Sequence, residues 1–494
     1  MLPREAYTNA DALIRAFFRL TVSRRHLLQW TTAEENENSR HIGISLISLA
    51  AGIVCLFAGT AIHRFSGIMF LSEIPFSVFS AKIKKAPVRK ISSDERETLV
   101  SYCRDMWKFF DDFCTSEYNY LIPDNIQLNS QFNIAKRTSP TNLGLMLCTF
   151  LASRDLGFID TKEMYVRISL SLDTIGNLPV YKGNLYNWYN IETLSIMEPE
   201  FISSVDSGNF LCCLTALKEG LKEYTDELPQ ITELTDKINR LIDRCDFGFL
   251  YSPRRNLFHT GFDVKNNKFS DSYYDLLMSE SRMAGYFAVA KGHAPVKHWQ
   301  ALGRPLSADG RYTGTVSWSG TMFEYFMPAL FLPDIPRTLA DESLNFCIYA
   351  QKKRVRKTDI PYGISESAYY SFDPALNYRY KAHGVSSLAM KRNNENETVI
   401  SPYSTFLTLP FDPHSAMKNL EHLKEIGMYG KFGFYEAVDF TPSRTDGHNY
   451  AIIKSYMAHH VGMSFLSAAN AVFSGIMQKR FMENSFMAGG ESLL

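Results

Sequence analysis

Two glutamates stand in aromatic, glycine-containing segments of this 494-residue chain, and their surroundings suit acid–base chemistry. Glu366 lies in Pro-Tyr-Gly-Ile-Ser-Glu-Ser-Ala-Tyr-Tyr (361–370), and Glu436 lies in Tyr-Gly-Lys-Phe-Gly-Phe-Tyr-Glu-Ala-Val-Asp-Phe-Thr-Pro (429–442). Carboxyl groups among rings, Gly and Ser are partly desolvated, which raises their pKa. Two such acids, with aromatic rings that stack on sugars, are what glycosidic bond chemistry requires. The alternative is two buried, hydrogen-bonded structural acids.

The overall composition excludes several other classes of function. Lys plus Arg equals Asp plus Glu at 52 each, so the chain has no net positive field that would favour nucleic acid. The eight cysteines have irregular spacing, which is typical of reduced, buried thiols in the cytosol. Metal-ligand spacing is missing, because the adjacent His459 and His460 point to different helix faces. We therefore expect neither a metal nor an organic cofactor.

The N-terminal region has the pattern of a membrane segment. Residues 8–31 form a basic amphipathic pattern, which suits a membrane surface or a bundle helix with a solvated face. The run 42–62 carries no charge in 21 positions, long enough to span a bilayer, and a weaker apolar run covers 65–83. Positive charge flanks both outer ends, which predicts a hairpin with cytoplasmic ends. One span with an interfacial segment, or a buried soluble helix, are the alternatives.

From about residue 92 onwards the pattern is that of a soluble, mainly helical domain. Ser92 and Glu95 have the spacing of a capping box at a helix start. Apolar periodicity predicts further helices at 141–154, 161–177, 207–224, 229–244, 272–291, 320–331, 336–351, 398–409, 413–426 and 450–473. Strand-like alternation is limited to 247–252 and 256–264. So many similar helices with long loops predict an (α/α)6 toroid whose loops line a central groove.

Eight segments in colinear order resemble the central, glycoamylase-like cyclising domain of bacterial cyclic β-1,2-glucan synthases. They cover 122–125, 137–144, 183–189, 204–209, 317–325, 361–370, 429–442 and 455–460, so the resemblance runs from about residue 95 to the C-terminus. Residues 2–33 also resemble the linker that precedes this domain. Asn184, Asn190 and Val461 depart from the family pattern, which weakens the assignment of substrate contacts more than that of the two glutamates.

The resemblance implies an anomer-retaining transglycosylation that closes linear β-1,2-glucan into a ring. One carboxylate attacks the anomeric carbon, and the other protonates the leaving oxygen and then deprotonates the incoming hydroxyl. Glu366 is predicted as the acid/base and Glu436 as the nucleophile, with the reverse order also open. Glu324 is a third acid, more simply interpreted as hydrogen-bonded inside a helix. Asp439 either orients Glu436 or caps a helix.

Further residues are expected to contact substrate because they lie in the family's motifs. Each has a structural alternative as a packing, capping or buried residue. They are Arg137, Asn142, Trp188, Tyr189, Asp206, Asn209, Trp318, Tyr369, Tyr370, His459 and His460.

The family's full chains also carry a glycosyltransferase and a phosphorylase-like domain, so this chain is expected to be a piece of a larger enzyme. The expected organisation is a basic helical linker at 1–40, a transmembrane hairpin at 41–85 and the catalytic domain at 92–494. The expected location is the inner membrane, with the catalytic domain facing the cytoplasm. An endo-β-1,2-glucanase on the same fold and an inactive glucan-binding remnant are the rival functions.

Overall fold

The fold is described by a computed structural model of the chain. It describes residues 49–57, 60–81, 90–128, 132–391 and 396–494, together with the isolated positions 13, 14 and 17. Contacts divide the chain into two compact units, Met1–Val88 and Arg89–Leu494. Each unit is described here by itself.

The first unit contains helical residues 49–57 and helix α3 (Ala61–Ala81). The two helices approach closely at Gly52 and Gly67, where an added Cβ on Gly67 would lie 2.8 Å from the Gly52 carbonyl oxygen. Among the described residues, no single helix has both the length and the hydrophobicity to cross a bilayer. Residues 42–48 of the predicted span lie outside the described residues, as does most of the predicted helix at 8–31. The membrane hairpin therefore stays a prediction.

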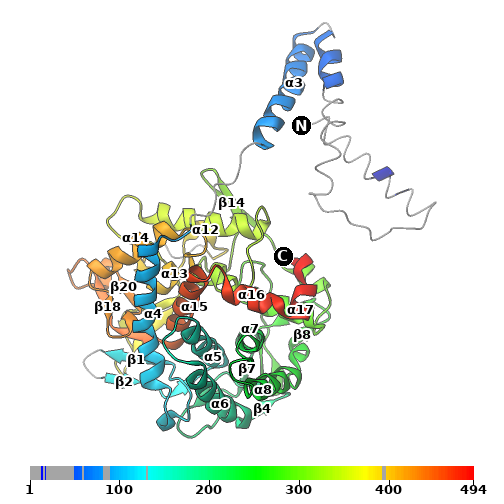
Figure 1. Cartoon of the computed structure of the whole chain (residues 1–494). Helices are drawn as coiled ribbons and strands as arrows, with labels where there is room; N and C mark the ends of the chain where they lie inside the picture. Colours follow the sequence, from blue (N-terminus) through cyan, green and yellow to red (C-terminus); the bar gives the residue numbers. More distant parts are fainter. Residues whose placement is uncertain are drawn as a thin grey trace. The chain divides into compact units, whose positions relative to one another are not determined.

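The second unit is built from helices that alternate between an inner and an outer set (Figure 1). The inner helices are α5 (Pro140–Asp155), α7 (Ser204–Lys222), α9 (Arg282–Lys291), α11 (Met322–Phe326), α13 (Pro402–Leu407) and α15 (Ala458–Val472). The outer helices are α4 (Ser93–Phe113), α6 (Thr161–Asn177), α8 (Ile231–Asp243), α10 (Lys297–Ala301), α12 (Leu339–Val355) and α14 (Pro413–Glu425). The predicted mainly helical architecture is confirmed.

Packing between these helices follows their order in the chain. Helix α5 packs on α7 and α15, α7 packs on α9, and α13 packs on α11 and α15. Each outer helix packs on the inner helix next to it, such as α8 on α7 and α14 on α13. Outer helix α4 begins with the predicted capping box, in which Glu95 N–H donates to Ser92 Oγ (3.2 Å) and Ser92 N–H donates to Glu95 Oε2 (2.8 Å). Helices α16 (Ile476–Glu483) and α17 (Ser485–Gly489) complete the chain.

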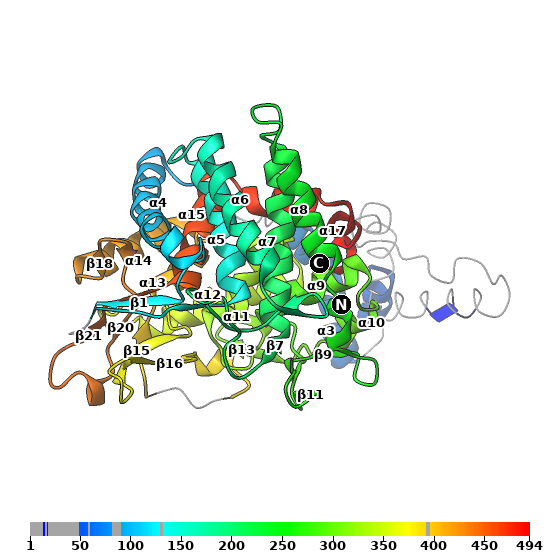
Figure 2. The same ribbon diagram turned by 90° about the horizontal axis from the view of Figure 1, so that it is seen from below.

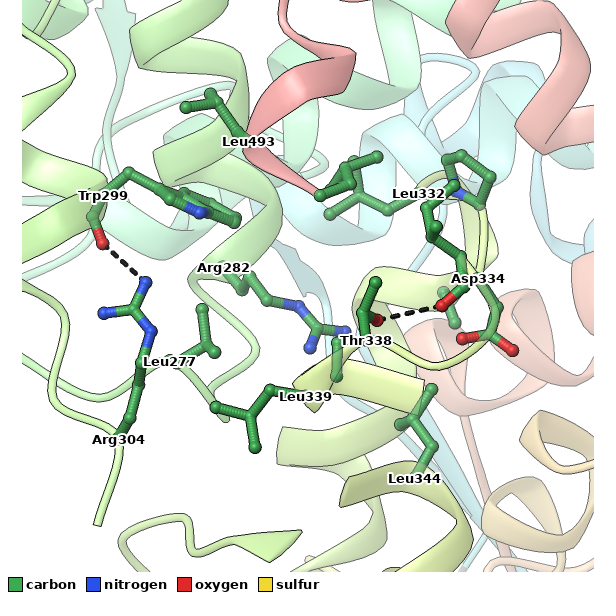
Figure 3. Close-up of a pocket in the computed structure, with 15 residues that line it drawn as sticks. Leu277, Arg282, Trp299, Arg304, Leu332, Asp334, Thr338, Leu339, Leu344 and Leu493 are labelled. Carbon is green, nitrogen blue, oxygen red and sulfur yellow. Dashed lines mark hydrogen bonds between the residues drawn. The ribbon is translucent and has the colours of Figure 1, made fainter. Parts of the chain in front are cut away.

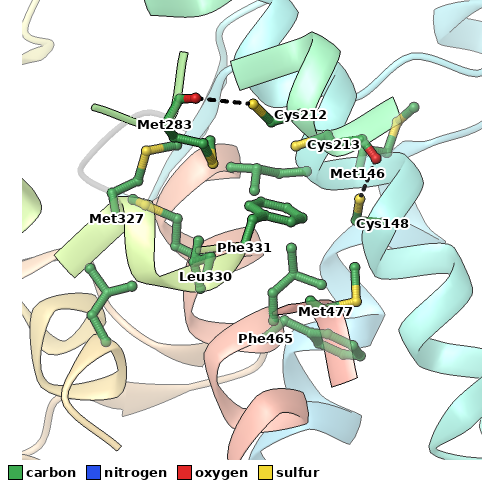
Figure 4. Close-up of a cluster of buried hydrophobic side chains, with 14 of the residues drawn as sticks. Met146, Cys148, Cys212, Cys213, Met283, Met327, Leu330, Phe331, Phe465 and Met477 are labelled. Atoms are coloured by element: carbon green, nitrogen blue, oxygen red, sulfur yellow. Dashed lines mark hydrogen bonds between the residues drawn. The ribbon is translucent and has the colours of Figure 1, made fainter. Parts of the chain in front are cut away.

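The space between the inner helices is filled with apolar and sulfur-containing side chains. Figure 4 shows Met146, Phe331 and Phe465 meeting there from different elements. All eight cysteines are free thiols, and seven of them are buried. Cys212 and Cys148 use their thiols as donors to the carbonyl oxygens of Met283 (3.6 Å) and Cys213 (3.4 Å). The middle of this unit is therefore a packed core.

Short antiparallel strands gather at one end of the helices (Figure 2). Three-stranded sheets have the orders β2-β1-β22, β11-β10-β7, β12-β9-β8 and β17-β20-β21, and β15-β16, β3-β6, β4-β5, β13-β14 and β18-β19 form pairs. Their bounds are β1 (Asn125–Leu128), β2 (Phe132–Ile134), β3 (Arg137–Thr138), β4 (Val180–Tyr181), β5 (Asn184–Leu185), β6 (Tyr189–Asn190), β7 (Phe201–Ser203), β8 (Tyr251–Ser252), β9 (Leu257–His259), β10 (Gly261–Asp263), β11 (Lys268–Phe269), β12 (Tyr273–Tyr274), β13 (Leu306–Asp309), β14 (Tyr312–Thr315), β15 (Ser367–Phe372), β16 (Tyr378–Lys381), β17 (Val399–Ile400), β18 (Tyr429–Gly430), β19 (Gly433–Phe434), β20 (Ala437–Asp439), β21 (Ala451–Ile453) and β22 (Ser455–Met457).

Several helix predictions are wrong at their N-terminal ends. The predicted helix 272–291 begins only at Arg282, and the residues before it form β12 and a turn. The predicted helix 450–473 begins at Ala458, after β21 and β22. In both segments the aromatic and β-branched residues that precede the helix pair with distant strands. These misplaced boundaries matter because residues at or just before the starts of α9 and α15 line the largest of the cavities described below.

Candidate active site

A cavity of about 830 Å³ lies at the N-terminal ends of the inner helices. Four of its wall residues lie in the first turns of inner helices: Thr141 in α5, Asp206 in α7, Phe323 in α11 and His459 in α15. A fifth, Glu280, lies in the turn before α9. Helix N-termini present unpaired N–H groups and a partial positive charge. Five helix starts around one cavity therefore favour polar and anionic groups at this wall.

Glu280 reaches the cavity from the turn between β12 and α9. Ser279 Oγ donates a hydrogen bond to Glu280 Oε2 (3.1 Å). Burial raises the pKa of Glu280 to about 8, and the negative charges of Glu324 and Glu366 add to the effect. The side chain lines the cavity, and with this pKa it carries a proton at neutral pH. That combination is suited to a general acid.

Glu366 lines the same cavity and precedes β15. The turn before it uses Gly363, whose φ of +134° is open to glycine but strained for other residues. Burial raises the pKa of Glu366 to about 7, while a hydrogen bond from Tyr380 opposes this shift by stabilising the carboxylate. The negative charge of Glu366 helps to raise the pKa of Glu280, and the charge of Glu324 raises the pKa of both acids. The two acids therefore share one electrostatic environment at the cavity.

Glu436 does not line this cavity and sits behind its wall. Its side chain is only 1% exposed, and its carboxylate accepts hydrogen bonds from the Ala368 N–H (3.1 Å) and from His460 Nδ1 (2.9 Å). Its own N–H donates to the carbonyl oxygen of Ser455 (2.9 Å), which ties it to β22. Burial raises the pKa of Glu436 to about 7. The residue expected to be the nucleophile is therefore one layer away from the cavity.

Glu324 is fully engaged in capping α11. Its Oε2 accepts from Ser317 Oγ, Thr321 N–H and Thr321 Oγ1 (2.9 Å each), and its Oε1 accepts from Ser319 N–H (3.0 Å). With both oxygens occupied by short hydrogen bonds, this carboxylate has a structural role. These hydrogen bonds are the kind that the simpler interpretation from the sequence expects.

One wall of the cavity holds a guanidinium fixed between an acid and a ring. Arg137 donates to Asp124 Oδ2 from Nε (3.3 Å) and from Nη2 (3.2 Å), and its guanidinium lies 4.5 Å from the centre of the Trp188 ring. Asn142 supports this acid by donating to Asp124 Oδ1 (3.1 Å). Arg137 and Trp188 both line the cavity, as expected from the sequence. An ordered ring and cation of this kind suit a sugar face and its hydroxyls.

Beside this wall, the start of α7 supplies hydrogen-bonding groups. Thr141 Oγ1 donates to Asp206 Oδ1 (2.6 Å), and Asn209 Nδ2 donates to Thr141 Oγ1 (3.2 Å). Asn187, with its amide oriented to satisfy both neighbours, donates to Asp206 Oδ2 (3.0 Å) and accepts from Trp188 Nε1 (3.0 Å). Asn209 lines the cavity as a residue, while its Oδ1 atom is buried and has no hydrogen-bond partner among the described residues.

Several residues expected to bind substrate lie elsewhere. The buried Tyr189 hydroxyl donates to the Pro179 carbonyl oxygen (2.5 Å), and Trp318 donates to Asp275 (2.8 Å). Asp439 is fully buried against Arg444 (2.6 Å) in β20, so it neither caps a helix nor faces the cavity. Tyr369 lies under Arg444, and Tyr370 is outside the cavity wall.

Tyr274 of β12 and two tyrosines of β16, the strand that pairs with β15, line the cavity wall. Tyr378 and Tyr380 of β16 line the cavity, and Ala368 of β15 pairs with Tyr380. Of the two adjacent histidines, His459 faces the cavity and His460 faces Glu436. Burial lowers the pKa of His459 to about 4 and that of His460 to about 3, so both rings are neutral.

The sequence analysis missed Glu280. Its predicted position inside a helix of 272–291 gave it the appearance of an ordinary helix residue. One signal was nevertheless available, because Glu280 and Glu366 are each the centre of a Ser-Glu-Ser tripeptide, at 279–281 and 365–367. The tripeptide supplies small, hydrogen-bonding neighbours to both acids.

Two other features bear on the chemistry of the site. Within the described ranges, no group of three or more His, Cys, Asp or Glu side chains is arranged to hold a metal ion. A second cavity of about 130 Å³ is lined mostly by apolar side chains, with Arg282 and Arg304 reaching it (Figure 3). Arg304 donates to the carbonyl oxygens of Trp299 (2.9 Å) and Leu302 (2.5 Å). Neither Glu280 nor Glu366 lines that cavity.

Comparisons with known proteins show similarity in sequence and in fold to proteins named as glucan-processing enzymes. Residues 272–485 match the Glycoamylase family model, described as "Putative glucoamylase", and residues 101–244 match the model of DUF3131, a family described as of unknown function. The chain is 29% identical to the cyclic β-(1,2)-glucan synthase NdvB of Rhizobium meliloti (strain 1021). The alignment covers 98% of this chain and 22% of that synthase, so the chain spans about a fifth of the relative's length.

Solved structures share the fold. An endo-β-1,2-glucanase of Chitinophaga pinensis, in complex with sophorotriose and glucose, matches with a TM-score of 0.66 at 16% identity, over 81% of this chain and 98% of that one. An endo-β-1,2-glucanase mutant of Talaromyces funiculosus, in complex with β-1,2-glucan, matches with a TM-score of 0.63 at 16% identity, over 81% and 89%. The chain thus carries a glycoamylase-like domain and is similar along nearly its whole length to part of a cyclic β-1,2-glucan synthase, as its sequence motifs indicated.

Proposed function

We propose that this chain cleaves β-1,2-glucan and joins the new end to the other end of the same chain, so that a linear glucan becomes a ring. The observation that carries the proposal is that Glu280 and Glu366, both with raised pKa, face one large polar cavity. The similarity to a cyclic β-1,2-glucan synthase supports the choice of substrate.

The two acids are assigned different roles because their surroundings differ. Glu280 has the higher pKa, near 8, and is therefore the proton donor to the leaving glycosidic oxygen. Glu366 has the lower pKa and receives a hydrogen bond from Tyr380, so it is the carboxylate that attacks the anomeric carbon. This assignment replaces the sequence-based pair of Glu366 as acid/base and Glu436 as nucleophile, since Glu436 does not reach the cavity wall.

The reaction has two steps with balanced protons and bonds. In the first, Glu366 forms a bond to the anomeric carbon while the glycosidic bond breaks and Glu280 protonates the departing oxygen. In the second, the non-reducing end of the bound chain donates its hydroxyl proton to Glu280 while its oxygen displaces Glu366. No water is consumed, because one glycosidic bond is broken and one is formed; the products are the ring and the released reducing-end segment.

The cavity wall supplies what this acceptor needs. The Arg137–Trp188 pair, which lines the same cavity as the two acids, holds a sugar ring of the bound chain. At about 830 Å³ the cavity holds several sugar units, so chain segments on both sides of the cleaved bond fill it and exclude water. Transfer to a sugar hydroxyl is then favoured over hydrolysis.

Endo-acting hydrolysis of β-1,2-glucan is the second candidate. The observation in its favour is the shared fold with two endo-β-1,2-glucanases. The same acids would serve it, with a water molecule in place of the sugar acceptor.

Incubation of the purified chain with linear β-1,2-glucan separates the candidates. Cyclisation yields products that resist an exo-β-glucosidase, whereas hydrolysis yields oligosaccharides that the exo-enzyme degrades. Unchanged substrate would indicate a glucan-binding remnant and would contradict both activities. Glu280→Gln and Glu366→Gln are expected to lower product formation about 1,000-fold while circular dichroism stays unchanged.

The context of the catalytic unit is part of the same proposal. Residues 41–85 anchor it to the inner membrane, with the unit facing the cytoplasm, because the run 42–62 is uncharged and basic residues flank the pair of apolar stretches. The remaining parts of a synthase, a glycosyltransferase and a phosphorylase-like domain, supply and process the linear glucan. Membrane fractionation of the full chain and of a variant lacking residues 1–85 tests the anchor, and loss of the full chain to the soluble fraction would contradict it.

A further inference from the structure

A continuous row of hydrogen-bonding groups connects Glu366 to Glu436. Glu436 Oε1 and Oε2 lie 3.0 and 2.9 Å from His460 Nδ1. On the far side of the imidazole, His460 Nε2 lies 3.4 Å from the Tyr380 hydroxyl. Tyr380 in turn hydrogen-bonds the Glu366 carboxyl group. Four side chains from four separate segments thus form one path from the cavity wall into the interior.

The protein holds the imidazole of His460 in place. The Tyr403 ring stacks on it with the ring centres 3.7 Å apart and the planes 11° apart. The Tyr403 hydroxyl donates to the main-chain oxygen of Glu366 (2.9 Å) and contacts Ser365 Oγ (2.9 Å). The same tyrosine therefore fixes both the imidazole and the backbone that carries Glu366.

We propose that Tyr380 and His460 form a proton relay between Glu366 and Glu436, so that the two carboxyl groups share one proton. Glu366 O–H donates to the Tyr380 oxygen, the Tyr380 hydrogen passes to His460 Nε2, and the Nδ1 hydrogen passes to Glu436. The result is an ionised Glu366, an intact phenol, a neutral His460 in its other tautomer and a protonated Glu436. Reversal of the same steps returns the proton.

The charges around the path favour this movement. His460 never needs to carry a charge, which agrees with its deep burial and strongly lowered pKa. The negative charge of Asp124 acts on Glu436, and the negative charges of Glu324 and Glu436 act on Glu366. Because ionisation of Glu436 disfavours ionisation of Glu366, one shared proton is the favoured state of the pair.

The relay gives Glu366 a route to its carboxylate form that does not use solvent. This inference rests on the proposed function, in which a glucan chain fills the cavity and excludes water. A proton removed from Glu366 then has no path to bulk solvent, and the buried Glu436 accepts it instead. Tyr380 and His460 are positioning residues in this sense, since they act on the sugar only through Glu366.

A double-mutant cycle with Tyr380→Phe and Glu436→Gln tests the relay. Tyr380→Phe removes the hydroxyl and keeps the ring of a residue that is 38% exposed. Each single variant is expected to lower kcat by about 100-fold with little change in KM. If both residues act through one path, the double variant is about as slow as the slower single variant. Losses that multiply would overturn the relay.

Two additions keep the result interpretable. Tyr429→Phe is the matched control, because it removes a hydroxyl that donates to Asp105 (2.6 Å) outside the cavity, and its kcat is expected to match the wild type. If Glu436→Gln does not fold, His460→Gln takes its place in the cycle with the same expectation.

An infrared pH titration of the carboxyl C=O stretch needs no substrate, so it separates failure of the relay from failure of the proposed function. The band removed by Glu436→Gln identifies Glu436 in the wild-type spectrum. The relay predicts that Tyr380→Phe changes the titration of this band as well as that of Glu366. An unchanged Glu436 titration overturns the relay even if the chain is inactive on β-1,2-glucan.

Discussion

Two clusters of buried charge in the helical unit are built in opposite ways. In the first, Arg480 of α16 is 1% exposed and donates to Asp155 at the end of α5 (2.6 and 2.8 Å) and to Glu223 just after α7 (2.6 and 2.7 Å). In the second, Glu280 and Glu366 face the cavity, and within the described residues neither forms an ion pair.

The difference indicates that the Arg480 cluster stabilises the fold, whereas the two cavity acids are suited to chemistry. The guanidinium of Arg480 neutralises the buried Asp155 and also pairs with Glu223, which is 41% exposed to solvent, so this cluster joins three helices without leaving a buried charge unpaired. Glu280 and Glu366 lack such compensation, and burial raises the pKa of both. Such an arrangement costs stability when the groups ionise, and it is typical of acids that exchange protons with a substrate.

The largest expected effect is on catalysis. Glu280→Gln and Glu366→Gln should each lower kcat on β-1,2-glucan by about 1,000-fold, because each removes a group that exchanges a proton or bonds to the sugar. Glu342→Gln, on the exposed face of α12, is the matched control and should leave kcat unchanged. Steady-state kinetics on the three variants measures this. Full activity of either cavity variant would contradict a catalytic role for that acid, and with it the difference between the two clusters.

The opposite outcome is expected at the first cluster. Arg480→Met should lower the free energy of unfolding by about 3–5 kcal/mol, because it leaves Asp155 buried without its cation. Lys431→Met removes an exposed pair with Asp112 and should change it by less than about 1 kcal/mol. Urea denaturation compares the two. Equal, small effects would show that the Arg480 cluster does not hold the helices together.

Binding of glucan should depend on the Arg137–Trp188 pair at the cavity wall. Arg137→Ala removes the cation between Asp124 and Trp188 and is expected to weaken oligosaccharide binding about 10-fold, or roughly 1.4 kcal/mol, with kcat little changed. Calorimetric titration with β-1,2-linked oligosaccharides gives the affinity. A loss of kcat with unchanged affinity would place Arg137 in the chemistry instead.

The smallest effect, a change of pH profile, sharpens the roles of the two acids. Glu366 must be ionised, so activity should fall as the pH drops below about 7, and Glu280 must be protonated, so activity should fall as the pH rises above about 8. The expected optimum of kcat/KM lies between these values. In the residual activity of Glu280→Gln the alkaline limb should disappear. An alkaline limb that persists would assign it to another group.

The sequence predicted the helical class and one cavity acid for clear physical reasons. Capping at Ser92 and Glu95 depends on residues three apart, so the helix start could be read directly. The desolvated setting of Glu366 also comes from its immediate neighbours in the chain. The colinear motifs identified the family because they depend on order along the chain and not on contacts.

The sequence could not predict which of these side chains face the cavity. Glu366 and Glu436 have similar neighbours in sequence, and only the pairing of β1 with β22 and of β17 with β20 places Glu436 behind the wall. Tyr380, and not Tyr369 or Tyr370, reaches the cavity because the β15–β16 hairpin sets the register. Glu280 was hidden by a helix boundary that tertiary pairing of β12 with β9 moves by ten residues.

Glu280 as proton donor and Glu366 as nucleophile are tested most directly with an aryl β-sophoroside whose leaving group needs no protonation. Glu280→Gln should release the aryl group in a single-turnover burst at close to the wild-type rate, because only the later attack of the acceptor on the glycosyl-enzyme needs Glu280 as a base; it should still lose activity on β-1,2-glucan, and Glu366→Gln should lose both the burst and the activity. If Glu280→Gln shows no fast burst, or Glu366→Gln keeps either one, the assignment of the two cavity acids is contradicted.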